Sequence, residues 1–182
     1  MKQWMIISAI AVVLIGAYLW NRNQNQPGTG EQVPPVEEII TQEDGTVIKK
    51  IGDTVQELSE ADMEAAKNLV DEKTKDVEPV DLKPEAGQGG TGSGSSKAVV
   101  SEGNYYQKIT LSNLPALQKG FYYEAWLQKQ DGSLGSIGRV EMTTLTSGQL
   151  YYQAKEDKSG TKVVISKQAE GQKEPGEILL KQ

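Results

Sequence analysis

The sequence predicts a mainly β protein: an N-terminal transmembrane helix, an acidic linker with one short helix, and a C-terminal antiparallel, immunoglobulin-like β-sandwich. Residues 4–20 carry no charge, whereas residues 27–96 hold sixteen acidic and six basic side chains. Residues 97–182 alternate between short apolar–polar stretches and turn residues. An apolar run of this length is typical of a membrane span, and regularly spaced short strands are typical of a sandwich.

The apolar run extends from Trp4 to Trp20 and reads WMIISAIAVVLIGAYLW, after a stub of three residues. As a helix it is about 25 Å long, close to the ~30 Å of a bilayer core. Trp4 lies at one end, and Tyr18 and Trp20 lie at the other, where aromatic rings favour the headgroup layer. We therefore expect an uncleaved anchor, with the remaining chain outside the membrane.

A cleaved signal peptide is the alternative interpretation of the same run. Lys2 supplies a short positive region, but the small residues that a signal peptidase requires are poorly placed. Ala17, for example, has Ile15 two positions before it.

The linker, residues 21–96, contains two segments with local structure. Residues 37–50 predict a hairpin around Asp44-Gly45, with a loose acidic linker as the alternative. Residues 60–73 predict a helix that begins after Ser59, with Asp62 in a capping box and apolar residues at helical spacing: Met63, Ala66, Leu69 and Val70. This helix is either a spacer or a partner-binding element.

The end of the linker predicts a domain boundary. Pro79 and Pro84 stiffen its first half, and the stretch from Gly87 to Ser96 consists mainly of glycine and serine. Such a composition is typical of a flexible connection. Residues 97–182 are therefore expected to fold as a separate domain.

Six or seven short strands are predicted in this domain, six of them at 105–111, 121–129, 134–142, 150–154, 162–167 and 177–180. Trp126, in the second strand, is expected to be a core anchor between the two sheets. Tyr122, Tyr151 and Tyr152 are interpreted as structural rings, with an exposed aromatic ligand face as the alternative.

The same domain resembles the C-terminal domain of the anti-sigma-K factor family from Ile109 onwards. That family has a Leu-Pro, Gly-x-x-Tyr-x-x-Trp-Leu stretch, a Ser-x-Gly-x-Val piece, a Val-rich strand and a late Pro-Gly. The matching residues are Leu114, Pro115, Gly120, Tyr123, Trp126, Leu127, Ser136, Gly138, Val140, Val163, Val164, Pro175 and Gly176. The resemblance implies a sandwich fold, a single span and an extracytoplasmic location.

Two departures limit what the resemblance implies. The Val-rich strand of the family commonly leads into a glutamate, whereas this chain has Gln168. Full family members carry a cytoplasmic sigma-binding domain before the span, whereas three residues precede it here. Direct binding of a sigma factor is therefore not expected.

The residues that could carry chemistry are few. The chain has no histidine and no cysteine, which excludes Cys/His zinc sites, haem ligation, thiol nucleophiles, Ser-His-Asp triads and disulfides. Ser159 and Lys162 have the spacing of serine acyl-enzymes, but they lie in a predicted turn without the companion motifs. Asp44 and Asp131 precede glycines, yet neither belongs to a calcium loop.

We expect no enzymatic activity, no cofactor and no metal. The net charge of −6, without a basic stripe, argues against nucleic acid as a partner. The sequence therefore predicts a bacterial-type, single-pass envelope protein whose sandwich binds or regulates an unidentified envelope protein or ligand. A structural or adhesive envelope module is the alternative.

Overall fold

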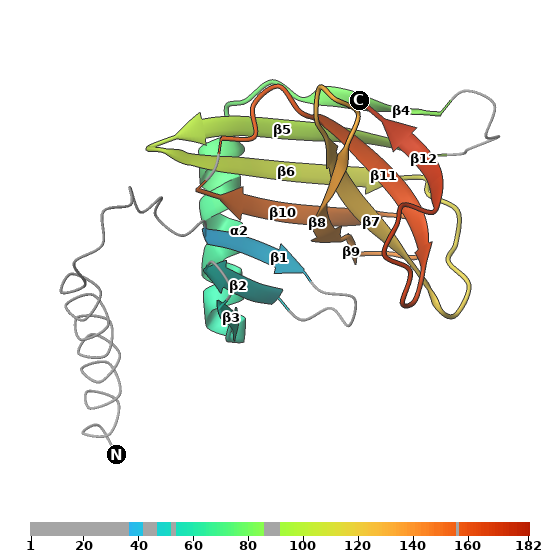
Figure 1. Ribbon diagram of the computed structural model, residues 1–182, viewed down its shortest axis with the longest axis horizontal. Helices are drawn as coiled ribbons and strands as arrows, with labels where there is room; N and C mark the ends of the chain where they lie inside the picture. Colours follow the sequence, from blue (N-terminus) through green and yellow to red (C-terminus); the bar gives the residue numbers. More distant parts are fainter. Residues whose placement is uncertain (1–36, 42–46, 52–53, 86–91, 156) are drawn as a thin grey trace, which may run out of the picture. The chain divides into compact units, whose positions relative to one another are not determined.

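The computed structural model describes residues 37–41, 47–51, 54–85, 92–155 and 157–182, all within one compact unit that spans Pro35–Gln182. These ranges form twelve strands and one helix (Figure 1). In chain order the elements are β1 (Glu37–Thr41), β2 (Val47–Ile51), β3 (Thr54–Glu57), α2 (Glu60–Thr74), β4 (Val80–Pro84), β5 (Ser93–Ser101), β6 (Asn104–Ser112), β7 (Phe121–Gln128), β8 (Leu134–Arg139), β9 (Glu141–Met142), β10 (Gly148–Ala154), β11 (Lys162–Ala169) and β12 (Glu177–Lys181).

The described strands form one sheet, in the order β3-β2-β1-β8-β7-β11-β12-β4-β5-β6-β10-β9. They pair antiparallel, apart from the parallel contact of β1 with β8 at Thr41 and Gly138. β1 also pairs with β10, through Glu38 and Ala154. Because β8 and β10 are far apart in this order, the sheet curves until both reach β1.

The curved sheet encloses one hydrophobic core. Alternate residues of β6 and β10 point inward, among them Ile109 and Leu150. They share one cluster with buried residues of β7 and β11, namely Tyr123, Ala125, Leu127, Val163 and Ile165. Full burial of one such large apolar side chain contributes roughly 1.5–3 kcal/mol. This shared cluster therefore holds the two facing parts of the sheet together.

The prediction of a mainly β chain is confirmed, and the core packs between facing parts of the sheet as it does in a sandwich. The strands nevertheless belong to one sheet, whereas the sequence predicts two. Two strands from the predicted linker make the connections: β1 joins β10 to β8, and β4 joins β12 to β5.

The six strands predicted after residue 97 are present, within a few residues at their ends. The run 134–142 is divided between β8 and β9 at Val140. The Val140 amide still donates to β7, to the Tyr123 carbonyl oxygen at 2.8 Å, and its side chain is buried in the core.

The prediction of a flexible linker up to residue 96 is wrong for its described part, which forms β1 to β4, α2 and the start of β5. The small residues before residue 97 are packing positions. A Cβ on Gly94 would lie 2.6 Å from Leu111 Cδ2, and the Ser96 side chain is buried against β6. The predicted boundary at Gly87–Ser96 therefore cuts through this sheet.

The predicted hairpin over 37–50 is confirmed by the antiparallel pairing of β1 with β2, and β3 extends it by one strand. Its Asp44-Gly45 turn lies outside the described residues.

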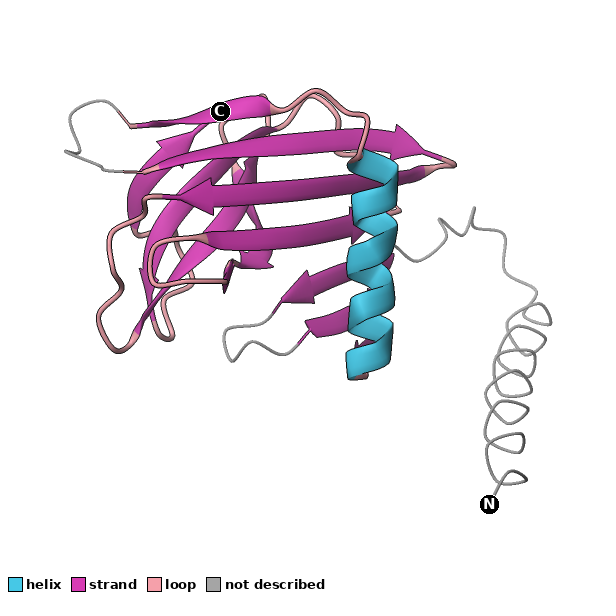
Figure 2. Ribbon diagram, turned by 180° about the vertical axis from the view of Figure 1, so that it is seen from behind, coloured by secondary structure: helices cyan, strands magenta, loops and turns pink. Residues whose placement is uncertain are grey.

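The predicted helix over 60–73 is confirmed as α2. Ser59 is its N-cap and accepts a hydrogen bond from the Asp62 amide at 3.3 Å. The helix lies across the outer face of the sheet and contacts β5, β6 and β10 (Figure 2). Val70 and Thr74 are its buried residues.

The predicted anchor, Trp4–Trp20, lies outside the described residues. Within the part of the chain that the structure describes, no helix is long and apolar enough to cross a bilayer.

Candidate functional site

The Leu-Pro and Gly-x-x-Tyr parts of the motif meet in the structure. The Tyr123 ring is fully buried, and its hydroxyl donates a hydrogen bond to the Pro115 carbonyl oxygen. Gly120, with φ +84°, forms the turn before β7 in a conformation that favours glycine. Burial raises the pKa of Tyr123, so the phenol remains a neutral donor. These residues fasten the loop after β6 to β7.

Trp126 is 5% exposed and therefore buried, as the sequence predicts. It lies outside the shared core cluster, and its indole N–H donates to Ser166 Oγ of β11 at 2.8 Å. Trp126 is thus an anchor between neighbouring strands and not between two sheets.

The late Pro175-Gly176 pair approaches β11 closely. A Cβ on Gly176 would lie 2.2 Å from the Lys167 carbonyl oxygen. The Gly176 amide donates to Gln168 Oε1 at 2.5 Å, and Gln168 Nε2 donates to Glu124 at 3.1 Å. Both ends of the Gln168 side-chain amide therefore have hydrogen-bond partners, and the residue has a structural role. The comparison with the family pattern does not predict this role.

The other motif positions are structural as well. Leu114, Leu127, Gly138 and Val140 are buried, whereas Ser136 is exposed and donates a hydrogen bond to Glu124. The motif thus marks a folding framework, and it does not converge on one site.

The alternative of an aromatic ligand face is wrong. Tyr122 and Tyr152 are each 2% exposed, and Tyr151 is half-buried beside α2. The Arg139 guanidinium lies 4.9 Å from the Tyr122 ring centre, where it covers that ring.

None of the described residues places a catalytic group beside Ser159. It is exposed in the turn before β11, and its amide donates to Asp157 Oδ1 at 2.7 Å. This hydrogen bond and one from the Ser159 hydroxyl lower the pKa of Asp157, so the carboxylate is a poor base. Lys162 is exposed at the start of β11. The described residues contain no group of three or more carboxylates that could hold a metal ion.

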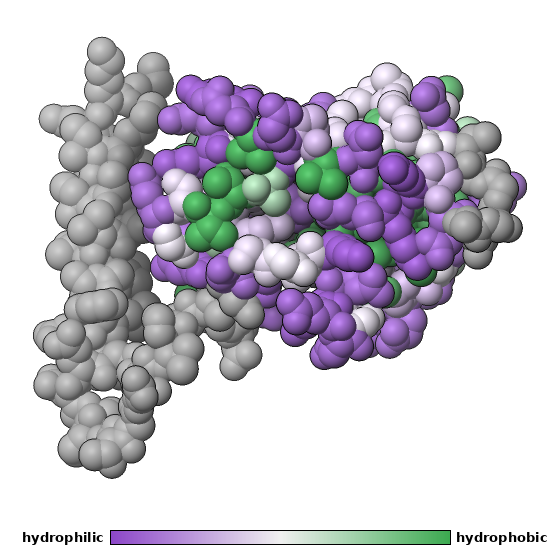
Figure 3. Space-filling model, turned by 90° about the horizontal axis from the view of Figure 1, so that it is seen from above, coloured by the Kyte–Doolittle hydropathy of each residue, from purple (hydrophilic) through white to green (hydrophobic). Residues whose placement is uncertain are grey.

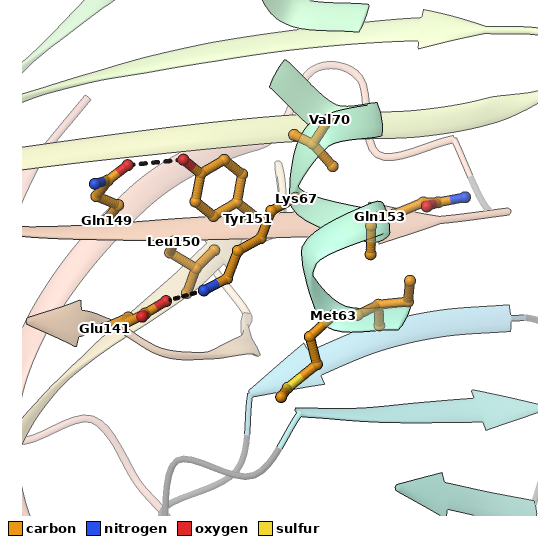
Figure 4. Close-up of a pocket in the computed structure, with 10 residues that line it drawn as sticks. Met63, Lys67, Val70, Glu141, Gln149, Leu150, Tyr151 and Gln153 are labelled. Carbon is orange, nitrogen blue, oxygen red and sulfur yellow. Dashed lines mark hydrogen bonds and ion pairs between the residues drawn. The ribbon is translucent and has the colours of Figure 1, made fainter. Parts of the chain in front are cut away.

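Among the hollows on the described part of the chain, three bear on a binding role. The first lies beneath α2, where Met63 and Val70 face Leu150 and Tyr151 of β10 (Figure 4). Lys67 and Glu141 form an ion pair of 2.6 Å across it. Its volume of about 20 Å³ is about that of a single water site, so it is a packing gap under the helix.

The second hollow, of about 370 Å³, lies beside the C-terminal end of α2 and is polar. Lys108 pairs with Asp71 at 2.5 Å, and Lys97 Nζ donates to the Lys75 carbonyl oxygen at 3.1 Å. The hydrogen bond from Lys108 to Asp71 and the nearby carboxylate charge raise the Lys108 pKa, although desolvation opposes them. Lys108 is thus neutralised by Asp71 and Lys97 is held by a backbone carbonyl oxygen, so the hollow is a weak candidate for an anion site.

The third hollow, of about 260 Å³, is named here the end cleft. It lies at the end of the sheet where the segment before β4, the second half of β5, the turn before β11 and the C-terminus meet. Its lining residues are Val77, Glu78, Val80, Ser96, Ala98, Val99, Val100, Tyr105, Gln107, Lys158, Ser159, Gly160, Thr161 and Gln182. Val80 and Val100 are 47% and 44% exposed, so large apolar side chains stand at its mouth.

Gln107 distinguishes the end cleft from the other two hollows. It is 2% exposed, and its Nε2 donates to Ser96 Oγ at 2.9 Å. Its Oε1 has no hydrogen-bond partner among the described residues. Most buried polar atoms in native proteins have a hydrogen-bond partner, so this oxygen indicates that a donor from another molecule belongs there. The signal in the sequence is a glutamine at an inward position, between Tyr105 and Ile109.

Tyr105 supplies a second polar group in the cleft. Burial raises the pKa of Tyr105 to about 12, despite a hydrogen bond with Thr161 that acts in the opposite direction. The phenol is therefore neutral at physiological pH. Its ring packs edge-on against Tyr152, at a centroid distance of 6.2 Å, which fixes its position.

Comparison with known proteins adds no relative: no family model, no curated protein and no solved structure matches this chain.

Proposed function

We propose that this chain is a single-pass membrane protein whose mainly β domain binds a partner outside the membrane and catalyses no reaction. The observation that carries the binding role is Gln107, which lines the end cleft and whose buried amide oxygen lacks a donor among the described residues. A buried polar atom without a partner costs roughly 1–3 kcal/mol, which a donor on a ligand offsets.

The membrane location rests on the sequence. The uncharged run Trp4–Trp20 has aromatic residues at both ends, as a span does. The motif residues that resemble anti-sigma-K factor C-terminal domains support a regulatory role for the domain, without direct binding of a sigma factor.

Photo-crosslinking in intact cells tests the binding role. A benzoylphenylalanine at Val100 stands at the mouth of the end cleft, and the same probe at Leu145 is the control. Leu145 is 84% exposed and lies far from the cleft. It stands in the loop before β10, where the Thr146 carbonyl oxygen accepts a hydrogen bond from the Leu114 amide, beyond the opposite end of β6. We expect a discrete adduct from position 100 alone. Equal adducts from both positions would contradict the proposal and favour an adhesive surface module.

A further inference from the structure

The second half of β5 has an unpaired edge in the described part of the chain. β6 pairs with β5 along its whole length, from Ser93 to Ser101. On the other edge, β4 pairs with Gly94–Ser96 only. Lys97–Ser101 therefore present a strand edge of five residues, about 16 Å long at the usual rise of roughly 3.3 Å per residue.

The end cleft lies along this edge. Ala98, Val99 and Val100 all line it, although consecutive residues of a strand point to opposite faces. Val80 of β4 and Gln107 of β6, the strands on either side of β5, also line it, so the cleft crosses β5 and reaches this edge. On the view from above, towards the side that carries β4 and β5, apolar side chains lie among polar ones (Figure 3).

Among the described residues of this edge, side chains that block strand addition are few. Exposed edges are commonly blocked by lysine, proline or a bulge. The one lysine, Lys97, is held towards α2 by its hydrogen bond to the Lys75 carbonyl oxygen at 3.1 Å. The edge then continues with Ala98, Val99, Val100 and Ser101, all of which favour or tolerate a strand.

The charge of the cleft indicates the chemistry of its occupant. Glu78 and Lys158 are its charged lining residues, and Lys158 lies 3.8 Å from Glu38. The terminal carboxylate of Gln182 adds a further negative charge, so the lining carries both signs and neither an anion nor a cation has a matching field of one sign. An unpaired backbone edge, exposed valines and one buried acceptor together match an uncharged, extended polypeptide.

We infer that the end cleft binds an extended peptide segment of a partner protein, which adds as a strand to β5 at Lys97–Ser101. The backbone of the peptide pairs with β5, and one of its side chains donates a hydrogen bond to Gln107 Oε1. Main-chain pairing then supplies affinity, and the valines with Gln107 supply selectivity. This inference rests on the proposed binding role and names the class of its partner.

The test selects nine-residue peptides from a random phage-displayed library against the full-length chain in detergent micelles. The variants are Val100→Asp, Gln107→Met and the matched control Val55→Asp, because Val55 is also an exposed valine on a strand, at 53%. We expect the best peptide to bind Val100→Asp and Gln107→Met at least tenfold more weakly, and Val55→Asp as tightly as the native chain.

N-methylation of the peptide backbone, one residue at a time, then tests strand pairing. A paired strand directs every second amide to its neighbour, so affinity should fall at least tenfold at alternate positions only. A peptide without this alternation, or one that binds Val100→Asp as well as the native chain, would overturn strand addition. A selection without any peptide binder would overturn it too. Discrete Val100 adducts in the cells would then leave the binding role itself in place.

Discussion

Gln107 Nε2 donates a hydrogen bond to Ser96 Oγ over 2.9 Å, and this contact joins β6 to β5 on the inner wall of the end cleft. Both side chains are 2% exposed. The pair uses one end of the glutamine amide and leaves the other end without a partner among the described residues. The domain therefore retains a buried polar pair with one unpaired oxygen, whereas an apolar pair at the same positions would avoid the free-energy cost of burying that oxygen.

Two variants separate the stabilising effect of the Ser96–Gln107 hydrogen bond from the cost of burying the polar atoms of this pair. Ser96→Ala leaves both ends of the buried amide unpaired, so it should lower the free energy of unfolding by about 1–3 kcal/mol. The double variant Ser96→Ala/Gln107→Met removes every polar atom at once and should be at least as stable as the native domain. Urea unfolding followed by tryptophan fluorescence measures both. A double variant less stable than Ser96→Ala alone would contradict this account.

The raised pKa of Tyr105 predicts a pH dependence of stability at alkaline pH. The folded domain holds the phenolic proton more tightly than the unfolded chain, because the pKa rises from 10.0 to about 12. The resulting stabilisation is complete below about pH 10 and is lost as the pH rises towards 12. Relative to Tyr105→Phe, the native domain should lose up to about 2–3 kcal/mol over this range. Parallel unfolding curves for the two proteins would contradict the burial of this hydroxyl.

Truncation tests where the folded unit begins. A fragment of residues 97–182 lacks β1 and β4, and it starts inside β5. It should therefore fail to unfold cooperatively, whereas a fragment of residues 35–182 should show one cooperative transition. Thermal unfolding by circular dichroism compares them. A sharp transition for the shorter fragment would restore the boundary that the glycine-rich composition suggests.

Gly176 is expected to be intolerant of a side chain. Because a Cβ there would lie 2.2 Å from the Lys167 carbonyl oxygen, Gly176→Ala must separate the chain before β12 from β11. We expect a loss of about 1–3 kcal/mol in the free energy of unfolding. Gly135→Ala is the matched control, since a Cβ on Gly135 has open space around it. Equal losses for both variants would show that the close approach does not matter.

The sequence predicts strands well where side chains alternate. β10 is an example, because its buried residues Gly148, Leu150, Tyr152 and Ala154 stand at every second position. It also predicts α2, because Ser59 and Asp62 form a local cap. These signals involve neighbours in the chain, so composition and spacing are sufficient to detect them.

The sequence could not predict the ring of pairings that joins the strands, because those contacts are distant in the chain. Gly94 and Ser96 have the composition of a linker, yet their small size is what lets β5 pack against Leu111 and Gln107. The candidate site was missed for the same reason. Its lining residues come from five separate segments, and only the inward glutamine of β6 gives a local sign of it.

The most direct test of the central claim uses the double variant Ser96→Ala/Gln107→Met with the crosslinker at Val100. Because this variant leaves no polar atom of the pair unsatisfied, it should keep an intact fold, and it removes the unpaired acceptor of the end cleft. We predict that its adduct yield in intact cells falls at least tenfold below that of the otherwise native chain, with no loss in thermal stability. An unchanged yield from a stably folded double variant would contradict the assignment of Gln107 to ligand binding.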